Sequence, residues 1–165
     1  MNRRPLSLSV RSARRWRLRP LVLSLACIGV GAHAQFNPSG GGVIAGFPIH
    51  GVMAANGGTV TGGIAGNTMT LTQETARAII NWQGFSIGAG NTVLVKQPGV
   101  SSVLLNRVVG TGTPGSITQS LIDGTLSANG RVFVVNPAGI VFGKSAQVNV
   151  GGLVASALDI RGASA

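Results

Sequence analysis

Side chains capable of acid–base or nucleophilic chemistry are few and scattered in this chain of 165 residues. The three carboxylates are Glu74, Asp123 and Asp159, and they form no local cluster of the kind that hydrolysis or calcium binding requires. His50 is the only imidazole after residue 34, so serine nucleophiles would have a single imidazole base. Spacing alone leaves a His–Ser pair open, but no other feature indicates one. We expect His50 in a surface loop, and no enzyme activity, metal site or cofactor.

One glycine-rich stretch fits the dinucleotide-binding pattern G-x-G-x-x-G, from Gly110 to Gly115. A nucleotide site would also need a helix that begins there and an acid about 20 residues further on. The segment 116–122 is short, and Asp123 comes too early. A loop rich in glycine and proline explains the stretch more simply.

The first 34 residues have the pattern of a secretory signal peptide. Seven arginines precede an apolar run over 21–31, which at 11 residues is too short to cross a bilayer as a helix. Ala32-His33-Ala34 has the small-residue pattern of a cleavage site, so we expect cleavage between Ala34 and Gln35. The predicted organisation is a signal peptide over 1–34 and one domain over 35–165, with an uncleaved membrane anchor as the alternative.

Removal of this segment changes the charge of the protein. The whole chain has 13 Lys and Arg against 3 Asp and Glu, a net charge of +10. Seven of the basic residues lie before residue 35, so the remainder has six against three, a net charge of +3. Because these six are dispersed and form no basic patch interleaved with aromatic residues, we expect no nucleic-acid partner. Cys27 also lies in the removed segment, which leaves a chain without disulfides for an oxidising compartment.

Short apolar runs separated by turn residues dominate the rest of the chain. The stretch 126–160 has four such runs of three to six residues, divided by Asn136-Pro137-Ala138-Gly139, by Gly143-Lys144-Ser145 and by Gly151-Gly152. Runs this short and rich in Val, Ile and Phe predict strands rather than helices. The segments 68–72, 92–95 and 102–109 also predict strands, and 74–80 favours a strand slightly over a short helix.

The same stretch repeats weakly on itself. Gly130 and Gly151 are 21 residues apart, and so are Val132 and Leu153. A period of about 20 residues, made of short strands and tight turns, is typical of a β-solenoid, whose coils stack about 4.8 Å apart and bury their inward side chains on one another. We therefore predict an all-β solenoid. The segment 35–66 is rich in glycine but too apolar for a solvated linker, and we expect it to cap the first coil.

Several motifs then resemble one family, in the family's order. Asn136-Pro137-Ala138-Gly139-Ile140 resembles the NPNGI signature of the two-partner secretion domain, which begins filamentous haemagglutinins, high-molecular-weight adhesins and related exoproteins. The resemblance covers roughly residues 40 to 160. Ala138 departs from the pattern, since the family usually has Asn there, and the absence of an Asn-Pro-Asn-Leu motif places the chain nearer the adhesin and haem-acquisition branch. Further residues that carry the match are Asn81, Trp82, Phe85, Gln97, Pro98, Asn106 and Arg107.

The resemblance implies a right-handed parallel β-helix with an N-terminal antiparallel β cap. It also implies that the inner-membrane export machinery delivers the unfolded chain to the periplasm. There the periplasmic domains of an outer-membrane β-barrel transporter would recognise it, and the chain would fold outside, secreted or at the cell surface. Residues 136–140 would then be a secretion motif or simply a corner of one coil. The structural reading is favoured, because Pro and Gly explain the geometry by themselves.

Other functions stay open. Family members act as adhesins or in haem acquisition through long downstream regions, which would supply any host-surface ligands. We expect 35–165 to be a targeting domain truncated at its C-terminal end, or an inert remnant of a longer protein. The last coil, ending near Ile160, would then present an open stacking face, from which we expect marginal stability or self-association. Trp82 and Phe85 are candidates for a partner surface, but core packing is favoured.

Overall fold

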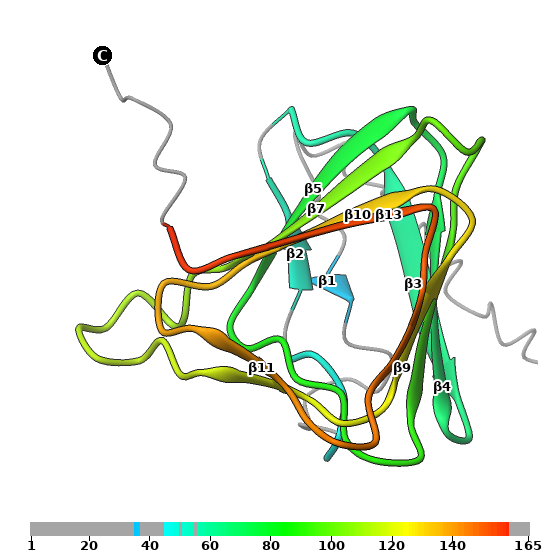
Figure 1. The fold of residues 1–165 in the computed structure, drawn as a ribbon. Coiled ribbons are helices and arrows are strands. Elements are labelled where there is room, and N and C mark those ends of the chain that lie inside the picture. The colour runs from blue at the N-terminus through cyan, green and yellow to red at the C-terminus, as the bar shows by residue number, and fades with distance from the viewer. Residues whose placement is uncertain (1–34, 37–44, 50, 55, 159–165) are drawn as a thin grey trace, which may run out of the picture. The chain divides into compact units, whose positions relative to one another are not determined.

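The computed structural model describes residues 35–36, 45–49, 51–54 and 56–158. The expected signal peptide, including Ala34 at its cleavage site, lies outside these residues, as do His50 and Asp159. Within the described part the chain is all-β, has no helix and forms a β-solenoid of about four turns (Figure 1). This confirms the predicted fold class. None of these residues forms a helix long and apolar enough to cross a membrane.

The strands of the solenoid form three parallel stacks, one on each side of the coil. The first, called the β4 sheet, contains β4 (Thr68–Gln73), β6 (Thr92–Lys96), β9 (Thr125–Ala128) and β12 (Gln147–Asn149). The second, called the β5 sheet, contains β5 (Arg77–Trp82), β7 (Val103–Val108), β10 (Arg131–Val135) and β13 (Gly152–Ser156). The third contains β8 (Ser120–Ile122) and β11 (Ile140–Phe142). Coil 1 begins with β4, coil 2 with β6, coil 3 with β9 and coil 4 with β12.

The weak sequence repeat corresponds to the separation in sequence between residues that align in neighbouring coils. Val132 on β10 aligns with Leu153 on β13, as their 21-residue separation predicts. At the corner before these strands, the Gly151 N–H donates to the Gly130 carbonyl oxygen at 2.8 Å. A Cβ at Gly151 would lie 2.9 Å from that oxygen, so glycine permits the two backbones to pass this closely.

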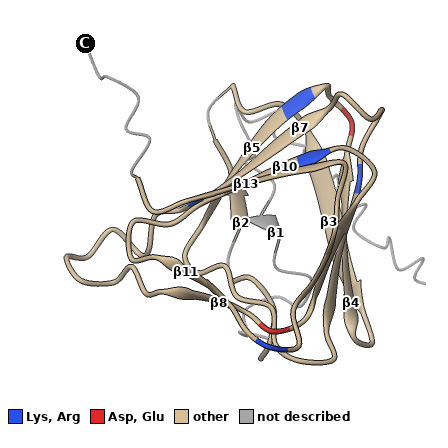
Figure 2. Ribbon diagram, in the orientation of Figure 1, with Lys and Arg blue, Asp and Glu red and all other residues tan. Residues whose placement is uncertain are grey.

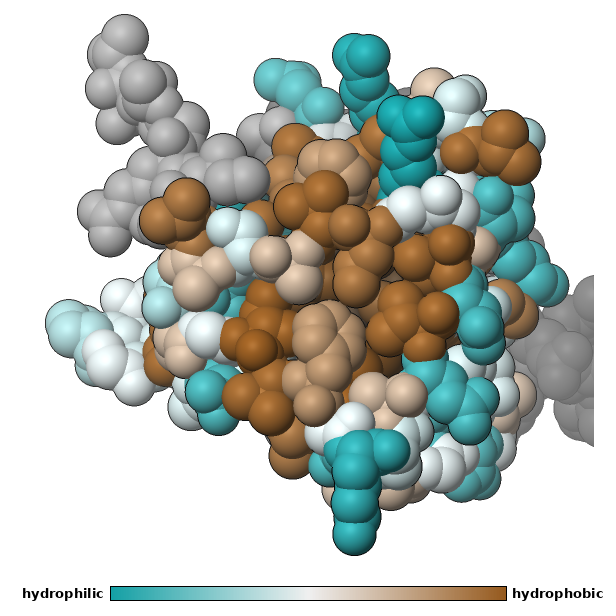
Figure 3. Space-filling model, in the orientation of Figure 1, coloured by the Kyte–Doolittle hydropathy of each residue, from teal (hydrophilic) through white to brown (hydrophobic). Residues whose placement is uncertain are grey.

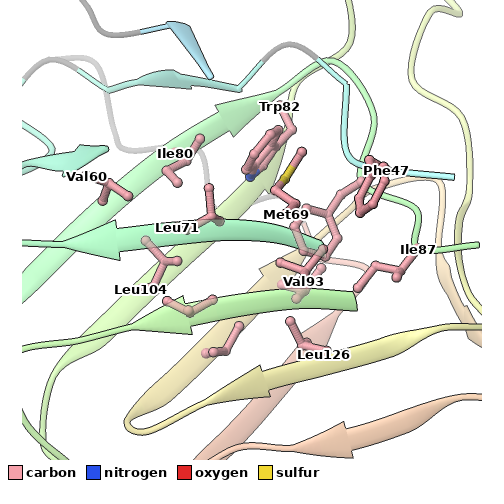
Figure 4. Close-up of a cluster of buried hydrophobic side chains, with 14 of the residues drawn as sticks. Phe47, Val60, Met69, Leu71, Ile80, Trp82, Ile87, Val93, Leu104 and Leu126 are labelled. Atoms are coloured by element: carbon pink, nitrogen blue, oxygen red, sulfur yellow. The ribbon is translucent and has the colours of Figure 1, made fainter. Parts of the chain in front are cut away.

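Strict alternation along the strands places one face of each sheet inside the coil. On β5 and β7 every second residue is buried, which is the period of a pleated strand. Trp82 and Phe85 lie in this core with their rings edge to face, 5.7 Å between centroids, so core packing is confirmed for both. Figure 4 shows Trp82 among the other buried side chains. The largest fully buried side chains are Trp82, Phe85, Met69, Leu71, Ile80, Ile87, Leu104, Ile122, Leu126, Val60, Val93 and Val95.

An antiparallel cap covers the first edges of two sheets. It consists of β1 (Gln35–Phe36), β2 (Gly51–Met53) and β3 (Val60–Ala65). β2 pairs antiparallel with β5, and β3 pairs antiparallel with β4, as the resemblance implied. Gly51 lies flat on the indole of Trp82, where a Cβ would come within 2.5 Å of a ring carbon. The cap therefore covers the edges of β4 and β5, which would otherwise be open to pairing with other chains.

The glycine-rich pattern at Gly110 is a loop. Residues 109–119 connect β7 to β8 and contain no helix, which confirms the simpler explanation. Gly110, Gly112 and Gly115 have φ values of +65°, +85° and +77°, a left-handed backbone that glycine adopts without steric cost. This loop lengthens coil 2 and projects from it (Figure 1).

The opposite end of the solenoid is open among the described residues. Phe142 aligns with the buried Ile122, and Leu153 aligns with the buried Val132, so both point inward. Phe142 is nevertheless 40% exposed and Leu153 38% exposed, since no further described coil covers them. Figure 3 shows the apolar surface that gathers over this end, where β11 and β13 lie.

Candidate functional site

The candidate secretion motif forms the turn between β10 and β11. The Gly139 N–H donates to the Asn136 carbonyl oxygen at 2.9 Å, which closes a four-residue β-turn. Asn in the first position, Pro in the second and Gly in the fourth are the preferences of a type I turn. Gly139 has a φ of +96°, which explains its glycine.

The departure from the family pattern at Ala138 is compatible with this turn. Ala138 occupies the third position, has no positive φ, and its side chain is exposed. Its backbone N–H donates to the Asn136 Oδ1 at 2.9 Å. Because the turn uses only the backbone of this residue, alanine can replace asparagine without loss of a hydrogen bond in the turn.

Asn136 joins three coils. Its side chain is fully buried, at 0% exposure. Its Nδ2 donates to the Thr118 carbonyl oxygen and to the Ser120 Oγ of coil 2, both at 2.8 Å. Its backbone N–H donates to the Ser156 carbonyl oxygen of coil 4 at 3.0 Å. A buried amide with all of these partners is a structural anchor, since each partner would otherwise lose a hydrogen bond.

The rest of the motif lies at the surface. Pro137 and Ala138 are exposed at the tip of the turn, and Ile140 is half-buried at the start of β11, where it aligns with Ser120. The motif therefore has a buried anchor at Asn136 and an exposed tip. In the folded domain a partner protein can contact the tip but not the anchor.

The family residues of β5 and β7 form one contact inside the coil and one outside. Inside, the Trp82 Nε1 donates to the Asn106 Oδ1 at 3.0 Å, and the Asn106 Nδ2 donates to the Phe133 carbonyl oxygen at 3.3 Å. Outside, the Arg107 Nε donates to the Asn81 Oδ1 at 3.0 Å. Asn106 and Arg107 interrupt an apolar run because each supplies a polar partner to the coil below.

Gln97 and Pro98 mark the corner after β6. The Gln97 N–H donates to the Asn129 Oδ1 at 2.7 Å, and the Asn129 Nδ2 returns a hydrogen bond to the Gln97 carbonyl oxygen at 2.8 Å. The Gln97 Nε2 donates to the Gln73 Oε1 at 2.9 Å, one coil below. Pro98 follows directly in the bend that leads to β7.

Sequence reasoning missed the partners of these residues, above all Gln73, Asn129 and Ser120. One signal was present: Gln73 and Gln97 are 24 residues apart, which is also the offset of β4 from β6 in their aligned register. The contacts to Asn129 and Ser120 depend on coil lengths that no local pattern reveals.

The polar groups brought together here are suited to joining coils. Among the described residues, no three His, Cys, Asp or Glu side chains gather as a metal site. Asp123 accepts a long hydrogen bond from the Ser145 Oγ at 3.4 Å, across neighbouring coils. Amides and hydroxyls that bond to each other and to the backbone stabilise a stack of coils.

The comparisons with known proteins agree with this architecture. A sequence profile of the TPS secretion domain matches residues 52–163. A heme/hemopexin-binding protein of Haemophilus influenzae is 38% identical over 129 residues, which cover 78% of this chain and 12% of that protein. A second heme/hemopexin-binding protein of Haemophilus influenzae is 39% identical over 92 residues, 56% of this chain and 9% of that protein. The chain thus spans only a small part of the length of these relatives.

A solved structure is similar as well. The crystal structure of the HMW1 secretion domain from Haemophilus influenzae aligns with a TM-score of 0.59 and 37% sequence identity, over 66% of this chain and 27% of that chain. The profile match extends from the cap strand β2 past the last described strand β13. The chain belongs to the TPS secretion domain family, the secretion domain of a two-partner secretion exoprotein.

Proposed function

We propose that this domain directs an exoprotein through a cognate outer-membrane β-barrel transporter. The inner-membrane export machinery delivers the chain to the periplasm, where the periplasmic domains of the transporter recognise it. The protein is then secreted or held at the cell surface. The observation that carries this proposal is the family match over residues 52–163, a range that includes every strand of the stack of parallel coils.

Folding outside the cell would favour outward movement of the chain. Each coil hydrogen-bonds to the coil before it, so every coil that emerges can add to the stack and release free energy. The cap closes the first edges of the β4 and β5 sheets, so the stack grows in one direction, from coil 1 toward coil 4. Backward sliding would then require unfolding of a coil.

The Asn136 corner belongs to this sequence of events. Asn136 contacts coil 2 through its side chain and coil 4 through its backbone, so coil 4 can stack correctly only after the corner forms.

Two hypotheses about the motif predict different results for secretion. If the transporter reads its side chains, Ala138→Arg abolishes secretion although the purified domain folds normally. If the corner acts through folding, Ala138→Arg is secreted and Asn136→Ala, which unfolds more easily, is not.

The main test is secretion of the whole chain from a didermal host, with and without a cognate transporter. We expect a product cleaved after Ala34 to appear in the medium only when the transporter is present. A transporter with its periplasmic domains deleted serves as the control. Retention in the periplasm under both conditions, with cleavage intact, would contradict the proposal and favour an inert remnant.

Haem acquisition is the second candidate, because both relatives are heme/hemopexin-binding proteins. Haem iron is held by His, Cys, Met or Tyr. Among the described residues only Met53 and Met69 are of these types, and both are buried, which is why this candidate comes second. Titration of the purified chain with haem tests it, because a bound haem shifts its Soret absorption band.

A further inference from the structure

The outer face of the β5 sheet has an unusual row of apolar side chains. Ile79, Leu105, Phe133 and Val154 align in register from coil 1 to coil 4, and all point away from the core. We call them the apolar ladder. The first three are half-buried and Val154 is 44% exposed. With coils about 4.8 Å apart, the ladder is about 14 Å long.

A groove follows this row. It has a volume of about 350 Å³ and is lined by Arg77, Ala78, Ile79, Val103, Leu105 and Phe133. Arg77 and Arg131 are exposed and lie two residues before the ladder residues of their own strands. Val103 lies between the two arginines in the register of the sheet. The groove therefore has an apolar floor and a cationic edge. Figure 2 shows the basic positions on β5 and β10 in blue.

This cationic edge has no acidic counterpart in the described part of the chain. The described acids are Glu74 and Asp123, and neither lies on a strand of the β5 sheet. Neither Arg77 nor Arg131 forms a salt bridge with a carboxylate of the described residues. A half-buried apolar row beside two such cations is complementary to a surface that is apolar and acidic.

We propose that this groove docks an amphipathic acidic helix of a partner protein, a function beyond secretion itself. β5, β7 and β10 are hydrogen-bonded on both sides, so a partner must bind through side chains rather than as an added strand. A helix that lies along the solenoid axis rises about 5.4 Å per turn, close to the coil spacing of about 4.8 Å. Ten residues of helix, about 15 Å, cover the apolar ladder.

The coil spacing also determines where the acidic residues of the partner helix should lie. Arg77 and Arg131 are two coils apart, about 9.6 Å, which matches carboxylates seven residues apart on a helix, about 10.5 Å. A helix with apolar residues at one-turn spacing and two such carboxylates along one edge therefore meets the groove and both guanidinium groups together.

A membrane surface fits these observations less well. Insertion into a bilayer needs apolar side chains that project from the protein. Ile79, Leu105 and Phe133 are instead half-buried in a groove, and the chain after residue 34 has a net charge of only +3. A complementary protein segment that enters the groove is favoured.

The test uses the purified full chain and a fluorescent synthetic 14-residue helical peptide, with four leucines at one-turn spacing and glutamates seven residues apart on one edge. A matched peptide has lysines in place of the glutamates. We expect the acidic peptide to bind at least tenfold more tightly in fluorescence anisotropy. The double variant Leu105→Ser/Phe133→Ser should weaken its binding at least tenfold, and Arg77→Glu/Arg131→Glu should reverse the preference between the peptides.

Matched variants on the β4 sheet control for general effects. Leu94→Ser removes an outward, half-buried leucine there, and Lys96→Glu reverses an exposed charge, and both should leave peptide binding unchanged. Circular dichroism and the unfolding midpoint confirm that each variant folds. Equal binding of both peptides, or binding unaffected by Leu105→Ser/Phe133→Ser, overturns the proposal. The proposal is also overturned if the chain binds neither peptide but sediments with phosphatidylglycerol vesicles, and Leu105→Ser/Phe133→Ser abolishes that sedimentation. This result would assign the groove to a membrane surface.

Discussion

Loss of the Asn136 side chain should destabilise the domain more than any surface change nearby. Asn136→Ala leaves the Thr118 carbonyl, the Ser120 hydroxyl and the Ala138 N–H without their present partner. Buried polar groups without a partner cost about 1 to 3 kcal/mol each, and some of these reach water, so we expect a loss of about 3 kcal/mol in the free energy of unfolding. Urea unfolding followed by circular dichroism measures it.

The control for this change is Asn149→Ala, which removes an exposed asparagine from β12. Its free energy of unfolding should stay within about 0.5 kcal/mol of the parent chain. Equal effects of the two substitutions would mean that the hydrogen bonds of Asn136 contribute nothing specific to the stack.

Residues with local roles could be predicted from the sequence, whereas residues with distant partners could not. The turn at Asn136 follows from its own Pro137 and Gly139, so its geometry was expected. Its buried contacts lie 16 and 18 residues away, at Ser120 and Thr118. Those separations depend on how the previous coil ends, which the turn residues do not specify.

Among the elements, the cap strand β2 offers the sharpest prediction. Gly51→Val would drive a side chain into the Trp82 ring, because even a Cβ would come within 2.5 Å of it. The strand must move away from β5, and we expect a loss of about 2 kcal/mol, as for other overpacked sites. Trp82 fluorescence in the processed chain should shift to longer wavelength as water reaches the indole.

Gly63→Val is the matched control, since it lies on the cap strand β3 with no atom within 4 Å of its Cβ position. Its stability and emission should stay the same or improve slightly, because valine favours strands. If both glycine substitutions leave the emission maximum unchanged, β2 does not cover Trp82 in solution.

Coil lengths explain why the repeat was visible in only one part of the chain. The aligned residues of β9 and β12 are 22 apart, as Thr125 and Gln147 show, whereas Thr92 and Thr125 of β6 and β9 are 33 apart. The loop 109–119 lies between the latter pair and breaks the period. The solenoid was therefore predictable from 126–160, but the position of coil 2 within it required the structure.

At the scale of the whole molecule, the open end of coil 4 should cause self-association. β11, β12 and β13 each pair with one described strand only, and the inward side chains Phe142 and Leu153 are partly exposed there. Unpaired strand edges beside apolar side chains are a template for another chain. We expect sedimentation velocity to show a monomer at low concentration and larger species at higher concentration, with an unfolding midpoint that rises with concentration.

Charges placed at this end should abolish the association if the end face mediates it. Phe142→Asp and Leu153→Asp introduce carboxylates at inward positions that only a stacked partner would bury, so the chain should stay monomeric. Leu121→Asp places the same charge on an outward, 45% exposed leucine of β8 and should leave association intact. A monomer at every concentration, with a sharp and concentration-independent transition, would show that the last coil is stable without a neighbour. Association that Leu121→Asp removes equally well would place the contact on the side of the solenoid instead of its end.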